Sequence, residues 1–502
     1  MAPLFANRWL IPLPPIWMLG AAAAVALGVI LAGYGLLRLA APRAAAEARA
    51  SLRDGFLGPL AWLLLTFSAV ALAFTYPLAA MSPSPLVEIG RSLRRFVAAA
   101  DGSLTVTVEP GATAAEIPLG FRPQELDRID VSADGRLVVR TQQPIAGFAL
   151  TKVPDVDVDP ATPWNWRRST GATNPFLGQR PTLQATTESD RPVTVTIRWR
   201  LMPEFREVAV LPWAAAILVA VTAAYAAVRL GARRVAAVAA ATTKEAIGQP
   251  VFAVALIAGT LLLFVFIIIP YNTFGDDVKM LKDSGLTLIK VLALLVVVWT
   301  ASVAVADEIE GRTALTVLSK PLTRGRFLVG KFLGLSLVAL LVFLILGGVL
   351  MATTSLKVVY DAREAAKVDP LWRDCAAEMI TVVPGLMLAL LETILLASVS
   401  LAVSTRLGMV PNLIVCFTVY ALGHLVPLIV QSSVGKFAIV RFVGRLFATL
   451  LPVLEHFTID AAVAGDVPVP WSYLGWAALY AGLYSTVALL VALVLFQDRD
   501  LA

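Results

Sequence analysis

The sequence is poor in three residue classes on which many protein functions depend. It has two cysteines and two histidines among 502 residues, so we expect neither a disulfide framework nor a histidine-based metal site. Charged residues make up only 15% of the chain, and the cations that give its formal net charge of +6 gather at the ends of apolar runs. Because they form no patch interleaved with aromatic residues, nucleic-acid binding is not expected.

Two loop motifs for ions and nucleotides are incomplete. The acidic run Asp155–Asp159 is similar to the front of a calcium loop, but Pro160 stands where that loop needs glycine, and no glutamate closes it. The segment Gly325–Phe332 is similar to a phosphate-binding loop, but Phe332 lacks the hydroxyl that would bind magnesium. We therefore expect no cofactor, metal or nucleotide site in the chain, and no enzymatic activity of its own.

Apolar residues dominate what is present. They make up 58% of the chain and form runs near the roughly 20 residues that cross a bilayer as a helix. The sequence predicts a mainly α polytopic membrane bundle of about nine transmembrane helices. The expected spans are Trp17–Leu39, Leu60–Ala80, Val208–Leu230, Val251–Tyr271, Leu286–Val305, Phe327–Met351, Ile380–Ser404, Val410–Val430 and Trp471–Phe496.

Arginines follow the first span rather than precede it, which favours a retained helix over a signal peptide. The distribution of cations predicts an N-terminus outside and a cytoplasmic C-terminus, in a cell (inner) membrane. Lys357–Glu378, with Cys375, is expected to be an outer loop. Gln431–Pro470 is also placed outside, although its cations oppose that placement, and an interfacial helix is the alternative.

Segment 81–207 has a different composition from the rest. Its hydrophobicity falls, and residues alternate as in strands at Ser103–Glu109, Gly135–Thr141 and Pro192–Leu201. We expect an inserted, β-rich extracytoplasmic domain. The expected organisation is two helices with a cytoplasmic loop in 1–80, this domain in 81–207, a third helix in 208–230, a cytoplasmic amphipathic helix in 231–249 and a six-helix domain in 250–502.

A polar island, Asp307–Lys331, separates two of the expected spans. It opens with three acids and continues with a short amphipathic piece that Pro321 ends, because proline has no N–H to donate. Thr323 can cap the helix that follows. Five cations in the island place it in the cytoplasm.

The island resembles the cytoplasmic loop of ABC-2 type permeases, the membrane subunits of ATP-driven exporters. Those loops join an acidic E-x-E-x-G segment and a short helix to S-K-P and basic residues. The resemblance extends from near Thr243 to the end of the chain. It is greatest to permeases of planctomycete-like bacteria, through Tyr271–Leu288, Val358–Lys367 and Phe496–Ala502. The N-terminal half departs from the family pattern, which leaves the cargo open.

The resemblance implies a permease subunit that couples a separate ATPase to export of a substrate. It also implies a homodimer, or a heterodimer with a similar permease. The coupling loop would be 307–326. Its coupling residues would be Glu308, Glu310, Gly311, Leu315, Leu318, Lys320, Pro321 and Arg324.

Ionisable residues inside the expected spans are the other candidates, because a charge in the membrane is costly. Glu392 is expected about 18 Å deep, and His424 and Lys290 about 8–9 Å deep, at roughly 1.5 Å per residue. These depths do not line up well enough to predict a Glu392–His424 pair, and snorkelling of Lys290 to the interface is favoured. For Glu392 a functional role and a helix–helix bridge remain open, as do function and a hydrogen-bonded core position for His424.

Two other functions remain open. A secondary transporter would show internal repeats with broken helices, and we find no repeat between the halves. A non-transporting membrane sensor or scaffold would bind a partner through the outer domain.

Overall fold

The structure is a computed structural model of the chain. It describes residues 10–42, 45–46, 48–49, 55–97, 101–110, 115–141, 156–168, 174–176, 181–187, 189–269, 277–307, 323–431, 442, 444, 446–447, 451–458 and 469–497. Two compact units are present. Unit 1 comprises Met1–Ser82 and Val210–Ala502, and unit 2 comprises Pro83–Ala209.

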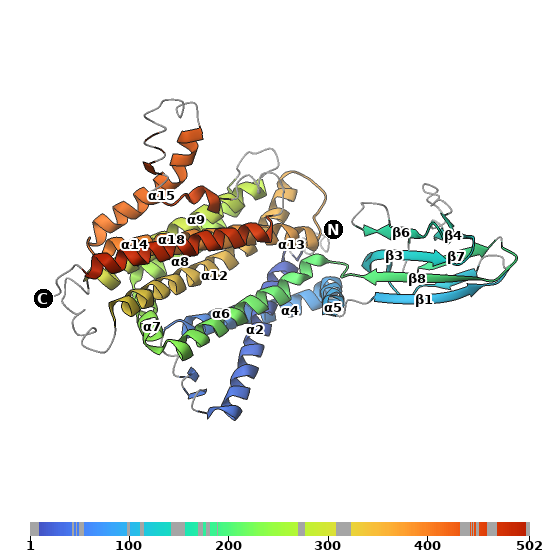
Figure 1. Cartoon of the computed structure of the whole chain (residues 1–502), viewed down its shortest axis with the longest axis horizontal. Coiled ribbons are helices and arrows are strands. Elements are labelled where there is room, and N and C mark those ends of the chain that lie inside the picture. The colour runs from blue at the N-terminus through green and yellow to red at the C-terminus, as the bar shows by residue number, and fades with distance from the viewer. Residues whose placement is uncertain are drawn as a thin grey trace. The chain divides into compact units, whose positions relative to one another are not determined.

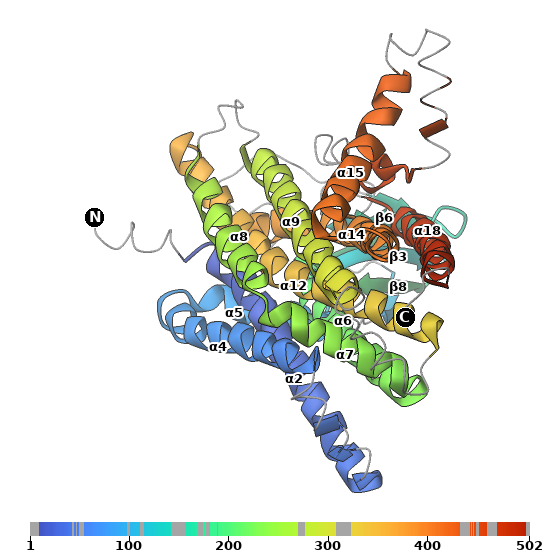
Figure 2. The ribbon, with the colours of Figure 1, turned by 90° about the vertical axis from the view of Figure 1, so that its left-hand side faces the viewer.

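Unit 1 is helical (Figures 1 and 2). Its elements in chain order are α2 (Leu13–Ala40), α4 (Leu57–Met81), α6 (Val210–Gly231), α7 (Arg233–Gly248), α8 (Pro250–Ile268), α9 (Asp277–Ala301), the π-helical turn η4 (Ser302–Asp307), α12 (Arg324–Glu364), α13 (Trp372–Ile380), α14 (Val383–Ser404), α15 (Met409–Gln431), the 3-10 turn η6 (Leu454–Phe457) and α18 (Trp471–Gln497).

Eight of the described helices are long and apolar enough to cross a membrane. They correspond to eight of the nine expected spans. The remaining one corresponds to α15, whose apolar stretch over the described residues is shorter, Met409–Leu425. The mainly helical class that the composition predicts is confirmed, and the eight long apolar helices fit a protein embedded in a membrane.

Helix α8 shows why unit 1 is a membrane structure. Its buried residues, Phe252, Ala255, Gly259 and Leu263, follow a single stripe at helical spacing. Its other face is equally apolar and open, with Val254 and Ile257 each more than 60% exposed. A helix at the surface of a soluble protein would carry polar residues on that face. The exposed face of α8 therefore fits the hydrocarbon of a lipid bilayer rather than water.

The long outer loop expected at Lys357–Glu378 is wrong for most of its length. Helix α12 continues to Glu364, and α13 begins at Trp372. Lys357 is fully buried; its ammonium donates to the Ile267 carbonyl at 3.1 Å and pairs with Asp361 at 2.9 Å. The charges at the start of this segment therefore do not mark a solvated loop, because Lys357 and Asp361 pair with each other at i and i+4 within α12.

Helix α13 is held by the same kind of contact. Glu378 forms an ion pair with Lys282 of α9, whose ammonium also donates to Thr381 Oγ1 at 2.6 Å. Cys375, expected in a loop, is fully buried in α13. Of the Gln431–Pro470 segment, the structure describes η6 and a few other residues; Lys436, Arg441 and Arg445 lie outside the described residues.

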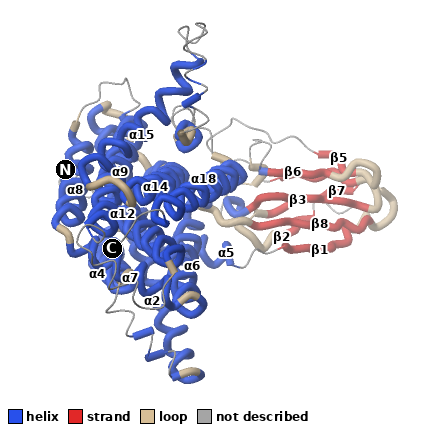
Figure 3. The backbone as a smooth tube through the Cα atoms, turned by 60° about the vertical axis from the view of Figure 1, so that its left-hand side comes forward, coloured by secondary structure: helices blue, strands red, loops and turns tan. Residues whose placement is uncertain are grey.

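Unit 2 contains two four-stranded antiparallel sheets (Figure 3). The strands are β1 (Asp101–Val108), β2 (Ala115–Pro118), β3 (Leu126–Ala133), β4 (Leu137–Thr141), β5 (Val156–Val158), β6 (Trp164–Arg167), β7 (Thr182–Thr187) and β8 (Val193–Leu201). Their orders are β1-β8-β3-β6 and β2-β7-β4-β5. The strands expected near Ser103, Gly135 and Pro192 are confirmed as β1, β4 and β8.

The two sheets share one apolar core. In β8, Val193, Val195 and Ile197 are buried while the residues between them are not, which is the period-two pattern of a sheet with one covered face. Residues of both sheets, such as Ile129 of β3 and Leu183 of β7, join the same cluster. Unit 2 is therefore a small β-sandwich.

A short helix and two 3-10 turns complete unit 2. Helix α5 (Pro83–Val97) precedes β1, η1 (Pro123–Glu125) precedes β3, and η3 (Arg206–Ala209) follows β8 and contacts α5. Arg95 of α5 donates through Nε to Glu125 Oε2 at 2.9 Å, and the Glu125 side chain is only 3% exposed. This ion pair joins the helix to the start of β3.

Arg95→Ala should lower the free energy of unfolding of unit 2 by about 2 kcal/mol, because it leaves the buried Glu125 carboxylate without its partner. Arg128→Ala is the matched control: it also removes an ion pair, with Asp130, but both side chains of that pair are partly exposed, at 45% and 31%, so it should contribute less than about 1 kcal/mol. Amide hydrogen exchange of β3 and β8 in the full chain measures both. Equal effects of the two variants would contradict this reading.

Candidate functional site: a buried charge cluster between three helices

The most deeply buried acid of the described bundle lies on α14. Glu392 is fully buried, and its position is fixed by a helix that starts with a proline in its first turn and is apolar on both sides of the glutamate. Charging a carboxylate in such surroundings is costly unless cations or hydrogen-bond donors face it. The structure places both next to it.

Two neighbouring helices supply the partners of Glu392. His424 of α15 lies with Nε2 2.8 Å from Glu392 Oε1. Lys290 of α9 lies with Nζ 3.2 Å from Glu392 Oε2. Tyr420, one turn before His424, has its ring 4.9 Å from the imidazole, and the Lys290 ammonium is 5.4 Å from the same ring. We call Lys290, Glu392, Tyr420 and His424 the charge cluster.

The predictions for these residues are therefore partly wrong. Glu392 and His424 form a pair that the expected depths gave no ground to predict. Lys290 does not snorkel to the interface but points to Glu392, with only 12% of its side chain exposed. The reason lies in α9, which begins at Asp277 rather than near Leu286. Lys290 is consequently 13 residues into the helix (290 − 277), about 20 Å from its first residue.

The charge balance of the cluster depends on His424. With a neutral imidazole that donates from Nε2, the lysine and the glutamate cancel. A second proton on the ring makes the cluster positive. Glu392 Oε2 lies close to the ammonium but accepts no well-aligned hydrogen bond within the part of the chain that the structure describes. The cluster can thus hold an ion pair or accept one further donor at Oε2.

A second polar group joins the same three helices. Asn412 of α15 donates through Nδ2 to Ser302 Oγ of η4 at 2.8 Å and to Ser400 Oγ of α14 at 3.0 Å. The Cys416 thiol donates to Asn412 Oδ1 at 3.3 Å. The sequence analysis missed this group, since a single asparagine or serine in an apolar run gives no indication of its partner. Helices α9, α14 and α15 are thus joined at two levels.

Ser302 starts the π-helical turn η4, which ends at Asp307. A π turn inside an α-helix is uncommon and is found mostly at functional sites. The residues predicted to couple to an ATPase follow it and lie outside the described residues: Glu308, Glu310, Gly311, Leu315, Leu318, Lys320 and Pro321. The turn therefore leads directly into the island.

Arg324 is the one predicted coupling residue that lies within the described part of the chain. It opens α12, capped by the Thr323 side chain as expected. Its Nη1 donates to the Gln497 carbonyl at 2.9 Å, and its guanidinium lies 5.8 Å from the Phe496 ring. The first turn of α12 is thereby fixed to the last turn of α18.

Close packing also holds α7 to the start of α12. A Cβ atom on Gly330 would lie 2.6 Å from Val238 Cβ, and one on Gly334 would lie 2.7 Å from Thr242 Cβ. Thr243 Oγ1 donates to the Gly334 carbonyl at 3.3 Å. Only glycine permits this approach of two helices. The amphipathic helix before the bundle and the helix after the island are therefore in intimate contact.

No protein-family model matches the chain, and no curated protein matches it.

Glu392→Gln should lower the stability of unit 1 by about 3 kcal/mol, because the Lys290 ammonium then lacks a counter-charge. Lys290→Met combined with Glu392→Leu should recover most of that loss, since the pair is removed as a whole. Thermal unfolding of the full chain in detergent measures both. If the loss of stability in the double variant equals the sum of the losses in Lys290→Met alone and Glu392→Leu alone, Lys290 and Glu392 do not interact.

Proposed function

We propose that this chain is the membrane subunit of an ATP-driven exporter, in which a separate ATPase acts on the Asp307–Lys331 island and moves the helices next to it. The observation that carries the proposal is the E-x-E-x-G and S-K-P pattern of the island, set between two membrane-length helices. The architecture around the island supports it through three contacts.

The first contact concerns the two ends of the island. Helix α9 leads into it through η4, and α12 leaves it at Arg324; α9 and α12 pack against each other. A push on the island therefore acts on two adjoining helices. The hydrogen bond from Arg324 to Gln497 extends the same push to α18.

The second contact is α7 against α12, through Gly330 and Gly334. An ATPase that touches both the island and α7 would hold one continuous surface. The third is the charge cluster on α9, α14 and α15, where a shift of α9 changes the distance between Lys290 and Glu392. ATP-driven closure would thus bias the bundle between two arrangements that differ at this ion pair.

The proposed topology has nine spans, with the N-terminus and unit 2 outside, and with the island and C-terminus in the cytoplasm. Two subunits, identical or similar, would pair with two copies of the ATPase. The added unit 2 would serve a substrate, a partner or an envelope component on the outer side.

A secondary transporter is the second candidate, and the charge cluster favours it. Lys290, Glu392 and His424 bring ionisable groups from three helices into contact inside the bundle, and such intramembrane groups are typical of ion and proton pathways. Transport that follows an imposed proton gradient in vesicles without any ATPase, and that stops in Glu392→Gln, would select this function over the exporter.

Labelling of single cysteines tests the topology. Cys375 and Cys416 are fully buried, so their background reactivity should be low. Ser132→Cys, at an exposed position of β3, should react with an impermeant thiol reagent in intact cells, whereas Ala314→Cys in the island should react only after the cells are opened. Labelling of Ala314→Cys from outside would reject both the topology and the exporter.

Charge and backbone changes in the island test the coupling. Glu310→Lys and, separately, Gly311→Val should leave the protein inserted and abundant while reducing copurification of the ATPase or uncoupling ATP hydrolysis from transport. Losing one partner of a charged contact costs about 2–5 kcal/mol when the contact is buried. Glu109→Lys, an exposed residue of unit 2, is the control. Normal ATPase binding and coupling in both island variants would remove the proposed role.

A further inference from the structure

Unit 2 contains a cavity of about 740 Å³ between α5 and the start of the sandwich. Its size falls in the range of small-molecule sites. Four arginines and one glutamate contribute to its wall, together with apolar residues and Gly120. The lining is Arg91, Arg94, Arg95, Pro118, Leu119, Gly120, Phe121, Arg122, Glu125 and Pro181.

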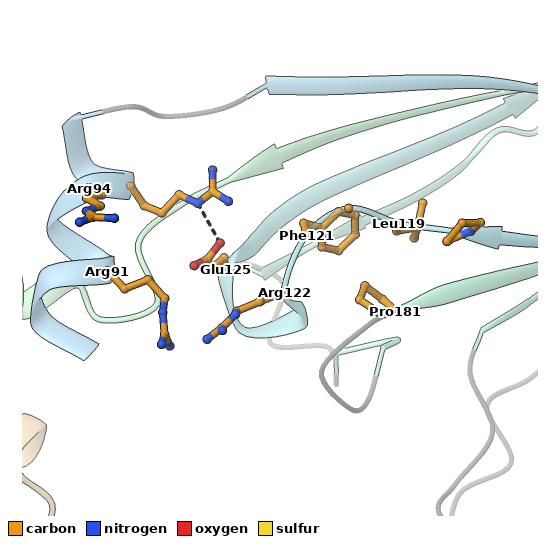
Figure 4. A pocket seen from close by; sticks show the side chains of 10 residues that line it. Arg91, Arg94, Leu119, Phe121, Arg122, Glu125 and Pro181 are labelled. Carbon is orange, nitrogen blue, oxygen red and sulfur yellow. Dashed lines mark hydrogen bonds and ion pairs between the residues drawn. The ribbon is translucent and has the colours of Figure 1, made fainter. Parts of the chain in front are cut away.

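The arginines come from two separate elements (Figure 4). Arg91, Arg94 and Arg95 share one side of α5, because they are spaced at i, i+3 and i+4. Arg122 precedes η1 on the opposite wall. Figure 4 shows the Arg91 and Arg122 side chains extending toward the same opening, although 31 residues separate them in sequence (122 − 91).

Structural roles account for only part of this concentration of charge. Arg95 is paired with the buried Glu125. Arg94 and Arg95 lie in the last turn of α5, where a cation interacts favourably with the helix dipole. Neither reason applies to Arg122. Arg91 and Arg122 are left as two guanidinium groups from different elements beside one opening.

Nearby acids offset only part of the positive charge at the cavity. Glu204 interacts with both Arg91 and Arg122, while its burial and its repulsion from Glu88 and Glu125 raise its pKa. Together, Glu88, Glu125 and Glu204 are fewer than the four arginines of the lining. The cavity wall therefore retains an excess of positive charge with which an external anion can interact.

The far wall of the cavity is apolar. Leu119 and Phe121 are buried against the sandwich core, and Phe121 packs edge-on against Phe176 with ring centroids 5.9 Å apart. Pro181 lies beside them (Figure 4). A ligand that spans the cavity would meet guanidinium groups at one end and hydrocarbon at the other.

We propose that this cavity binds a phosphate group attached to an apolar or glycerol-like body, with Arg91 and Arg122 as its ligands. Guanidinium groups bind the oxygens of phosphate in a bidentate manner. A phospholipid headgroup and a soluble organic phosphate share this chemistry. The chain connections favour the lipid, because α4 and α6 are long and apolar enough to cross a membrane and both join unit 2 almost directly. Ser82 alone separates α4 from α5, and η3 ends at the residue before α6. The inference goes beyond the exporter function and does not depend on it.

The full chain in detergent can be titrated with dihexanoyl phosphatidylglycerol, dihexanoyl phosphatidylcholine and glycerol 1-phosphate. Amide hydrogen exchange over 83–97 and 115–125 reports binding. Saturable protection by phosphatidylglycerol but not by phosphatidylcholine or glycerol 1-phosphate identifies a lipid headgroup site. Protection by glycerol 1-phosphate as well identifies a site for soluble organic phosphates. If neither phosphatidylglycerol nor glycerol 1-phosphate protects these segments, the proposal is overturned.

Variants separate a built site from general attraction by charge. Arg91→Gln combined with Arg122→Gln should raise the Kd at least tenfold, and Glu204→Gln should lower it. The matched control combines Arg136→Gln with Arg200→Gln, which removes the same charge from largely exposed surface ion pairs and should leave the Kd within twofold. Equal weakening by both double variants would reject the site.

Unchanged exchange protection of β3 and β8 verifies that the variants are folded. If Arg91→Gln with Arg122→Gln unfolds unit 2, Arg91→Lys with Arg122→Lys replaces it. The lysines keep the charge and lose the bidentate geometry, so the Kd should still rise, by about three- to tenfold. An unchanged Kd in the lysine variant would contradict the guanidinium contacts.

Discussion

A charged carboxylate at the centre of an apolar bundle constrains everything around it. Glu392 requires partners from other helices, and the packing of α9, α14 and α15 provides them at one level, where Lys290 and His424 contact it. Such a pair adds little net stability compared with a well-packed apolar replacement. Its effect is on specificity, because any register of these helices that separates the three groups leaves an uncompensated charge.

The sequence predicts the elements of this fold well and their contacts poorly. The lengths of apolar runs predict the helix bounds within a few residues where polar residues or prolines follow the run, as for α2, α4 and α18. Alternation likewise predicts β1 and β8. Both signals are local, because they arise from one face of one element.

Polar residues within helices were the source of the errors. The sequence around Lys357 has the composition of a surface loop, yet Lys357 is buried by Asp361 and by carbonyls of α8. Lys290 was assigned to the interface because the start of α9 was placed nine residues late. In each case the burial of the charge depends on a group on another helix at least 90 positions away, Ile267 for Lys357 and Glu392 for Lys290. A single sequence does not reveal which distant group that is.

Helix α12 combines several of these features in one element. At 41 residues it is about 60 Å long, roughly twice the thickness of the hydrocarbon layer of a bilayer. Its first turn is attached to α18 through Arg324 and packed on α7, and its last turns hold the buried Lys357–Asp361 pair. An unbroken helix of this length behaves as a stiff lever: a tilt of a few degrees at the island end displaces the opposite end by several ångströms. Under the proposed function, a displacement at the island would reach the far end of this helix without any hinge in the helix itself.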